Sequence, residues 1–172
     1  TSVWSPIFTN FQEKQVRTVF ETAGGTIFIG SDRGLFKSTN RGKTWKHVHA
    51  GGLVGHLAES DGVLLATSMR RIIRSTDNGE NWAVVTTEGS VAFDIKPIKG
   101  GFAAMTSTSA SNPRGIRTSY DGGITWQPNN AGNKVLIETI WRTWNDRPIV
   151  KAFMTSIIQV GENFVCTHRD GI

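Results

Sequence analysis

Four carboxylates outside the predicted turns are candidates for a general acid and a general base: Glu21, Asp94, Glu138 and Asp146. Cleavage of a glycosidic bond by the common two-carboxylate mechanism needs one acid that donates a proton and a second that acts as base or nucleophile. Asp94 and Glu21 fall at or near the first strand of a repeat described below. They are therefore the two catalytic candidates, and the ordinary alternative is that both are solvated side chains.

Other side-chain chemistries find less support. His47 and His49 alternate on a predicted strand, a spacing that could bind a metal, but no third ligand is near, so we expect exposed edge residues and neither metal nor cofactor. The single cysteine, Cys166, follows an apolar pair and is expected to be a buried strand residue rather than a nucleophile. One cysteine also excludes an intramolecular disulfide. Ser/His/Asp catalysis is not predicted, since no Gly-x-Ser-x-Gly elbow occurs.

The most informative pattern is a polar turn that ends in tryptophan and occurs three times. The copies are Ser38-Thr39-Asn40-Arg41-Gly42-Lys43-Thr44-Trp45, Ser75-Thr76-Asp77-Asn78-Gly79-Glu80-Asn81-Trp82 and Ser119-Tyr120-Asp121-Gly122-Gly123-Ile124-Thr125-Trp126. The tryptophans are 37 and 44 residues apart, a period that fits a unit of four short strands.

We interpret the turn as a structural device. Ser and Asp side chains bond backbone amides inside a tight turn, Gly allows a positive φ, and Trp buries its ring against the neighbouring unit. A calcium loop needs more carboxylates than these turns supply. The positions with this expected role are Ser38, Asn40, Gly42, Trp45, Ser75, Asp77, Gly79, Trp82, Ser119, Asp121, Gly123 and Trp126.

The segments before each copy predict three further strands. They are 16–20, 26–30 and 34–38 in the first unit, 54–58, 63–67 and 71–75 in the second, and 91–95, 102–106 and 115–118 in the third. Runs such as Val63-Leu64-Leu65-Ala66 are apolar on both faces, as strands between stacked sheets are. The predicted fold is an all-β β-propeller of four-stranded antiparallel blades, with about four blades or parts of blades in this chain.

The blade units span about 12–48, 53–87, 90–130 and 155–172 together with 1–8, as a single domain or partial propeller over 1–172. Further blades or another chain could close the ring.

An insertion at about 133–154 contains a cluster that the repeat does not explain, namely Trp141, Arg142, Trp144, Asp146 and Arg147. It is either an extended strand pair packed on the propeller or an aromatic and basic contact surface for a partner or a sugar, because Trp and Arg are enriched in binding hot spots.

The three turns resemble Asp-boxes, also called bacterial neuraminidase repeats, whose pattern is Ser-x-Asp-x-Gly-x-Thr-Trp. The third copy matches every fixed position, the second has Asn81 in place of Thr, and the first has Asn40 in place of Asp. Asn40 can accept the same amide bonds through its carbonyl oxygen. The resemblance implies a propeller similar to those of sialidases, sortilin-like receptors, photosystem II assembly factors and xyloglucan-cleaving glycosidases.

A sialidase of this family would use an arginine cluster, a tyrosine nucleophile and an acidic proton donor. The only tyrosine, Tyr120, lies inside a polar turn, so sialidase activity is not expected. We predict a non-catalytic propeller that binds a protein segment or glycan at the channel mouth and through Trp141, Arg142, Trp144 and Arg147. The alternative is a glycoside hydrolase-like propeller with Asp94 and Glu21 as its acids, so whether the chain is an enzyme stays open.

Composition and charge limit the partners. The chain has 172 residues, 19 Gly, 38% hydrophobic residues and a net charge of +5. The basic residues are dispersed, so a nucleic-acid partner is not expected. No apolar run reaches the length of a membrane span. No targeting segment is visible at Thr1, and the family resemblance favours a secreted or extracytoplasmic location.

Overall fold

The structure, a computed structural model, describes residues 11–13, 15–85, 91–107, 115–129, 142–144, 147–149, 154–161 and 163–168. Within these ranges every regular element is a strand. Among them there is also no helix of the length and apolarity that a membrane crossing requires.

Three antiparallel sheets of four strands follow one another along the chain, each as an up-and-down meander. Blade 1 contains β1 (Val16–Glu21), β2 (Ile27–Ser31), β3 (Gly34–Ser38) and β4 (Lys46–His49). Blade 2 contains β5 (Val54–Ser60), β6 (Val63–Ser68), β7 (Arg71–Ser75) and β8 (Ala83–Val85). Blade 3 contains β9 (Val91–Ile98), β10 (Gly101–Ser107), β11 (Gly115–Ser119) and β12 (Gln127–Pro128).

Two smaller sheets complete the described strands. β15 (Met154–Val160) pairs with β16 (Asn163–His168), which contains Cys166. β13 (Arg142–Trp144) and β14 (Arg147–Ile149) form a separate hairpin within the predicted insertion. The predicted all-β fold with propeller blades is confirmed.

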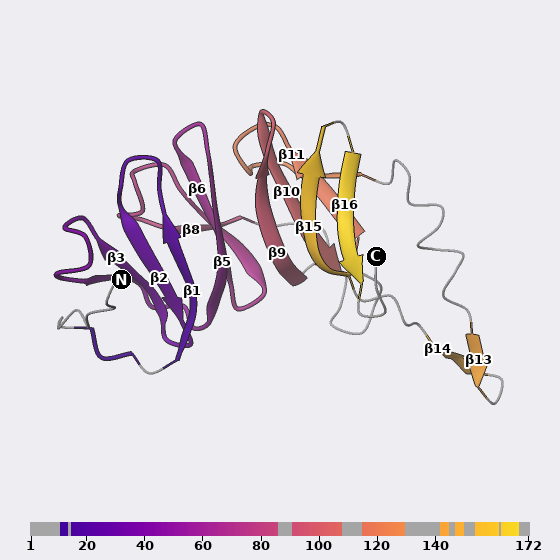
Figure 1. Cartoon of the computed structure of the whole chain (residues 1–172), viewed down its shortest axis with the longest axis horizontal. Helices are drawn as coiled ribbons and strands as arrows, with labels where there is room; N and C mark the ends of the chain where they lie inside the picture. The colour runs from indigo at the N-terminus through magenta and orange to yellow at the C-terminus, as the bar shows by residue number, and fades with distance from the viewer. Residues whose placement is uncertain are drawn as a thin grey trace, which may run out of the picture.

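The sheets stand side by side in chain order (Figure 1). Their first strands, β1, β5, β9 and β15, lie next to one another as innermost strands. Each of these four strands carries a register shift near its N-terminal end. The irregularity is therefore a property of the repeat rather than of one blade, and bulges of this kind redirect side chains at sheet edges.

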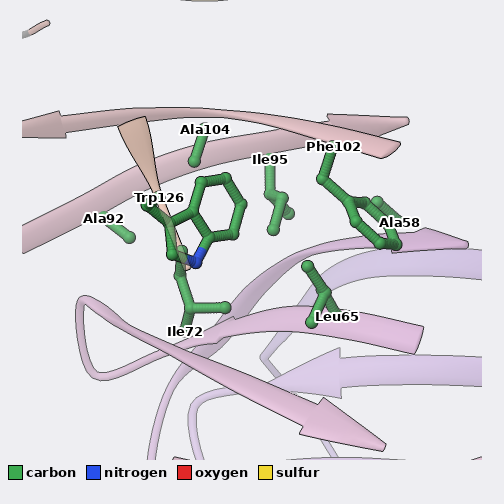
Figure 2. Close-up of a cluster of buried hydrophobic side chains, with 8 residues drawn as sticks. All are labelled: Ala58, Leu65, Ile72, Ala92, Ile95, Phe102, Ala104 and Trp126. Atoms are coloured by element: carbon green, nitrogen blue, oxygen red, sulfur yellow. The ribbon is translucent and has the colours of Figure 1, made fainter. Parts of the chain in front are cut away.

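Hydrophobic cores lie between the blades. One joins blades 1 and 2 through residues such as Phe28, Leu64 and Ile73. The next joins blades 2 and 3 (Figure 2) and contains Ala58, Leu65, Ile72, Ala92, Ile95, Phe102, Ala104 and Trp126. A third includes Ala103, Met105 and Ile157 and joins blade 3 to β15.

β6 shows why its sequence is apolar on both faces. Leu64 belongs to the core shared with blade 1 and its neighbour Leu65 to the core shared with blade 3, and both are fully buried. The turns at the two ends of β6 have positive φ at consecutive residues, Asp61 (49°) with Gly62 (75°) and Met69 (47°) with Arg70 (66°). Consecutive positive φ angles are typical of two-residue hairpin turns, which set strand register.

Candidate functional site

The three polar turns are built by hydrogen bonds within each turn. In the second, Asp77 Oδ1 accepts hydrogen bonds from the Ser75 hydroxyl (2.7 Å) and from the amides of Glu80 and Asn81 (both 3.0 Å). The Ser75 hydroxyl in turn accepts the Gly79 amide at 2.9 Å. These bonds, first the one from the Asn81 amide, hold the pKa of Asp77 well below its usual range. The carboxylate is therefore committed to the turn.

The other two turns repeat this arrangement with different side chains. Asp121 accepts from the Thr125 side chain and amide, which lowers its pKa to about 2. In the first turn, Asn40 Oδ1 accepts the Thr44 amide (2.9 Å) and its Nδ2 donates to Thr44 Oγ1 (2.8 Å). The amide oxygen of Asn40 thus occupies the place of a carboxylate oxygen.

Each of the last two turns packs on the preceding blade. The indole of Trp82 donates to the Gly79 carbonyl at 3.1 Å and meets the Phe28 ring edge-on, with ring centroids 6.2 Å apart. Trp126 makes the same bond to Gly123 and lies in the core of Figure 2. A side chain at Gly79 would overlap the Phe28 ring. The turns hold neighbouring blades together, and the side-chain oxygens of Asn40, Asp77 and Asp121 are used inside them.

A polar cluster lies on the innermost strands of blades 2 and 3. Asp94, whose side chain is 2% exposed, is 3.1 Å from His56 Nδ1 and 3.6 Å from Lys96 Nζ. His56 and Lys96 are partly exposed. The amide of Ile95 also donates to Asp94 Oδ1, at 2.8 Å. The structure therefore presents an imidazole and an ammonium group to solvent, both positioned by one buried carboxylate.

The other catalytic candidate is in a different place. Glu21 is exposed and lies opposite Ile27, beside the β1–β2 turn, whereas Asp94 lies opposite Met105, toward the other end of its strand. The two residues belong to innermost strands of different blades, with β5 between them. The sequence pointed to Asp94, and Lys96 two residues later belongs to the same face of a strand. Nothing in the sequence brings His56 beside them, because it is in another repeat.

The predicted contact cluster of the insertion falls only partly in the described residues. Arg142 and Trp144 are in β13 and Arg147 is in β14, so the three residues lie on the two strands of one short hairpin. Trp141 and Asp146 lie outside the described residues, as does Glu138. The backbone pairing places Trp144 opposite Arg147 and Arg142 opposite Ile149.

The histidine pair on β4 has structural partners. His47 stacks on the ring of Phe36, with centroids 4.4 Å apart, and His49 Nε2 is 2.9 Å from the hydroxyl of Ser68 in blade 2. Burial lowers the pKa of His49, and the nearby His47 lowers it further. The described residues contain no group of three His, Cys, Asp or Glu side chains that could hold a metal ion.

These features define a class of protein: β-propeller blades joined by tryptophan-ended polar turns. The family model for the BNR/Asp-box repeat matches residues 117–128, so the chain carries an Asp-box repeat and the resemblance seen in the sequence is confirmed. A search of curated proteins found no match.

Solved structures share the fold at low identity. YCF48 from Cyanidioschyzon merolae has a TM-score of 0.65 and 13% identity, over 98% of this chain and 54% of that one. YCF48 bound to D1 peptide has a TM-score of 0.57 and 15% identity, over 92% and 51%. An ancestral GH74 enzyme has a TM-score of 0.56 and 18% identity, over 72% and 20%. The chain thus spans about half the length of each YCF48 structure and a fifth of the GH74 enzyme.

Proposed function

We propose that this chain is a non-catalytic binding module that holds a protein segment against its innermost strands. The observation that carries this proposal is a polar cluster on two of those strands, each of which is an edge strand of its sheet. The cluster of His56, Asp94 and Lys96 lies on β5 and β9.

Such a surface suits an extended peptide. Lys96 and His56 supply hydrogen-bond donors to such a segment. The innermost strands are also the edges of their sheets, where backbone groups can pair with an added segment. YCF48, which shares the fold, has been solved with a D1 peptide bound.

The hairpin β13–β14 is the second proposed contact. Arg142, Trp144 and Arg147, together with Trp141, combine the two residue types most enriched in binding hot spots. A partner that reaches both the innermost strands and this hairpin would be held at two points, which raises its affinity through effective concentration.

A peptide array read with the purified protein tests this proposal. Lys96→Ala and His56→Ala are expected to weaken binding of the selected peptides about ten-fold each, the cost of a lost charge-assisted hydrogen bond. Lys99→Ala is the matched control, because Lys99 is exposed in the turn between β9 and β10. Trp141→Ala and Trp144→Ala test the hairpin. Equal binding by all five proteins would contradict the proposal.

Glycan cleavage is the second candidate function, and the buried carboxylate of Asp94 beside an imidazole and an ammonium group is what favours it. Glu21 would be the other acid. Turnover of sialosides or β-glucans that is lost in Asp94→Asn or Glu21→Gln would support this candidate. The absence of turnover on both substrate classes would end it.

A further inference from the structure

The boundary between blades 1 and 2, which we call the first seam, is closed by side chains of the second Asp-box. Glu80 accepts from Lys37 Nζ at 2.6 Å and from Lys46 Nζ at 2.7 Å. Asn78 Nδ2 donates to Thr26 Oγ1 of blade 1 at 3.2 Å. The Lys37 side chain is only 5% exposed, so these contacts seal the end of the seam.

The second seam, between blades 2 and 3, lacks this seal. Aligning the boxes places Gly122 where the second box has Asn78, and Ile124 where it has Glu80. Arg74 stands at the position of Lys37, but without a carboxylate to meet it, Arg74 Nε donates to the Gly122 carbonyl at 2.7 Å. Ile124 is 58% exposed. The third box therefore leaves open a site that the second box fills.

The result is a cleft of about 290 Å³ at the second seam. Its lining includes Asp61, Arg74, Phe102, Tyr120, Asp121 and Gly122. Phe102 also belongs to the core drawn in Figure 2, so the cleft opens at the edge of that core. Its volume lies near the lower end of the range for small-molecule sites.

The lining combines three kinds of group. Tyr120, which occupies the position of Thr76 in the second box, is 66% exposed and offers an aromatic face. Arg74 supplies guanidinium N–H donors, of which Nε–H is already donated to the Gly122 carbonyl. Asp61 supplies carboxylate acceptors. The cleft thus offers an apolar ring face, donors and acceptors within one small volume.

We propose that this cleft binds a neutral saccharide unit. A sugar ring has an apolar face that can stack on Tyr120 and hydroxyl groups that both donate and accept, which matches Asp61 and Arg74 together. An anionic ligand such as a sialic acid or a phosphate would meet two carboxylates, Asp61 and Asp121, against the single guanidinium of Arg74, and like charges at close range repel. A neutral sugar meets no such penalty. The site shares no residue with the proposed peptide site on the innermost strands.

Saturation-transfer NMR with a panel of neutral sugars tests the proposal, the probes being glucose, galactose, mannose, xylose, N-acetylglucosamine and cellobiose. At least one is expected to bind, and Tyr120→Ala is expected to weaken it about ten-fold through loss of the stacked ring. Thr76→Ala, the same position in the sealed box, is the matched control and should bind as the unchanged protein does. N-acetylneuraminic acid should not compete.

A second variant closes the cleft by restoring the seal. Gly122→Asn combined with Ile124→Glu copies the second box, and Asn is suited to the positive φ of 71° at Gly122 because Asn78 adopts 57°. The new carboxylate would pair with Arg74 as Glu80 pairs with Lys37. Sugar binding should be lost while the melting temperature is kept.

No binding of any neutral sugar, or equal binding by Tyr120→Ala, would overturn the saccharide proposal. Because Tyr120 is exposed, its truncation tests the cleft even if the double variant fails to fold. Peptide binding by Tyr120→Ala should be unchanged, so failure at the cleft and failure at the innermost strands are separate results.

Discussion

At the scale of single residues, the Asp-boxes show that the turn depends on where an acceptor lies rather than on a negative charge. Asn40 and Asp121 fill equivalent positions and each accepts the amide four residues later in the chain. The two turns differ in the role of the threonine hydroxyl. Thr44 accepts from Asn40 Nδ2, whereas Thr125 donates to Asp121. A hydroxyl can rotate to serve either role.

Asp121→Asn should therefore cost much less stability than Asp121→Ala. The alanine variant leaves the Ile124 and Thr125 amides without their acceptor, and we expect a loss of about 1–2 kcal/mol. The asparagine variant reproduces the first box and should lose less than half as much. Urea denaturation at pH 7 measures both. Equal losses would mean that the charge itself matters.

The same residue predicts an acid response. The pKa of Asp121 is lowered to about 2 in the folded chain. A group with a depressed pKa stabilises the fold above its unfolded pKa, near 3.9, and that stabilisation disappears as the pH falls toward about 2. Asp121→Asn should flatten this part of the stability profile. A profile identical to that of the unchanged protein between pH 4 and pH 2 would contradict the assignment.

His49 predicts a change at milder pH. Its pKa is lowered, chiefly by burial against blade 2, so the neutral ring is favoured in the folded chain. Stability is then full above the unfolded pKa of about 6.5 and decreases as the pH falls through the lower folded value. His49→Gln should remove this decrease while keeping a polar contact to Ser68. Urea midpoints at pH 7.5 and 5.5 for both proteins measure the effect.

At the scale of elements, the glycines of the Asp-boxes mark where a turn touches the neighbouring blade. Gly79 has φ 76° and faces the Phe28 ring, while Gly62, with φ 75°, has nothing within 4 Å of its missing side chain. The two residues thus share the same backbone conformation and differ in what surrounds them. This pair separates the cost of the conformation from the cost of the clash.

Gly79→Ala should consequently destabilise the chain by more than Gly62→Ala. Both variants place a side chain at positive φ, which costs about 1 kcal/mol. Only Gly79→Ala also forces Phe28 or the turn to move, and overpacking of this kind costs about 1–3 kcal/mol more. Thermal unfolding of the two variants gives the comparison. Equal melting temperatures would show that the box does not bear on blade 1.

At the scale of the whole molecule, each blade is stabilised mainly by its neighbours. The cores lie between blades, and residues of one blade contribute to two of them. Stability in such arrays is a sum over units and the contacts between nearest neighbours. A mutation at one seam should therefore first destabilise the two blades that meet there.

Trp126→Ala tests this locality. Trp126 is 7% exposed within the core between blades 2 and 3, and its truncation should cost about 3–5 kcal/mol. Hydrogen exchange should accelerate most in β6, β10 and their partners, and least in β1–β3. Uniform acceleration over all described strands would instead indicate that the blades unfold as one unit.

The sequence predicted what is encoded locally. The Asp-box bonds join residues two to four positions apart, and the strands follow from short apolar runs between turns. What it could not predict depends on residues far apart in the chain. His56 meets Asp94 only because the innermost strands of two blades lie together. The cleft at the second seam likewise depends on Arg74 and Gly122, which are brought together from different repeats.

The sequence of β6 has one further consequence, which concerns the register in which this strand pairs with its neighbours. Leu64 and Leu65 are equally apolar, and each packs in a different core. A shift of the strand by one residue would therefore bury about as much apolar surface as the observed register does. The register is instead fixed by the turns at the two ends of the strand, Asp61 with Gly62 and Met69 with Arg70. Lengthening either turn by one residue would remove this constraint, and the same strand could then pair in two registers of nearly equal free energy.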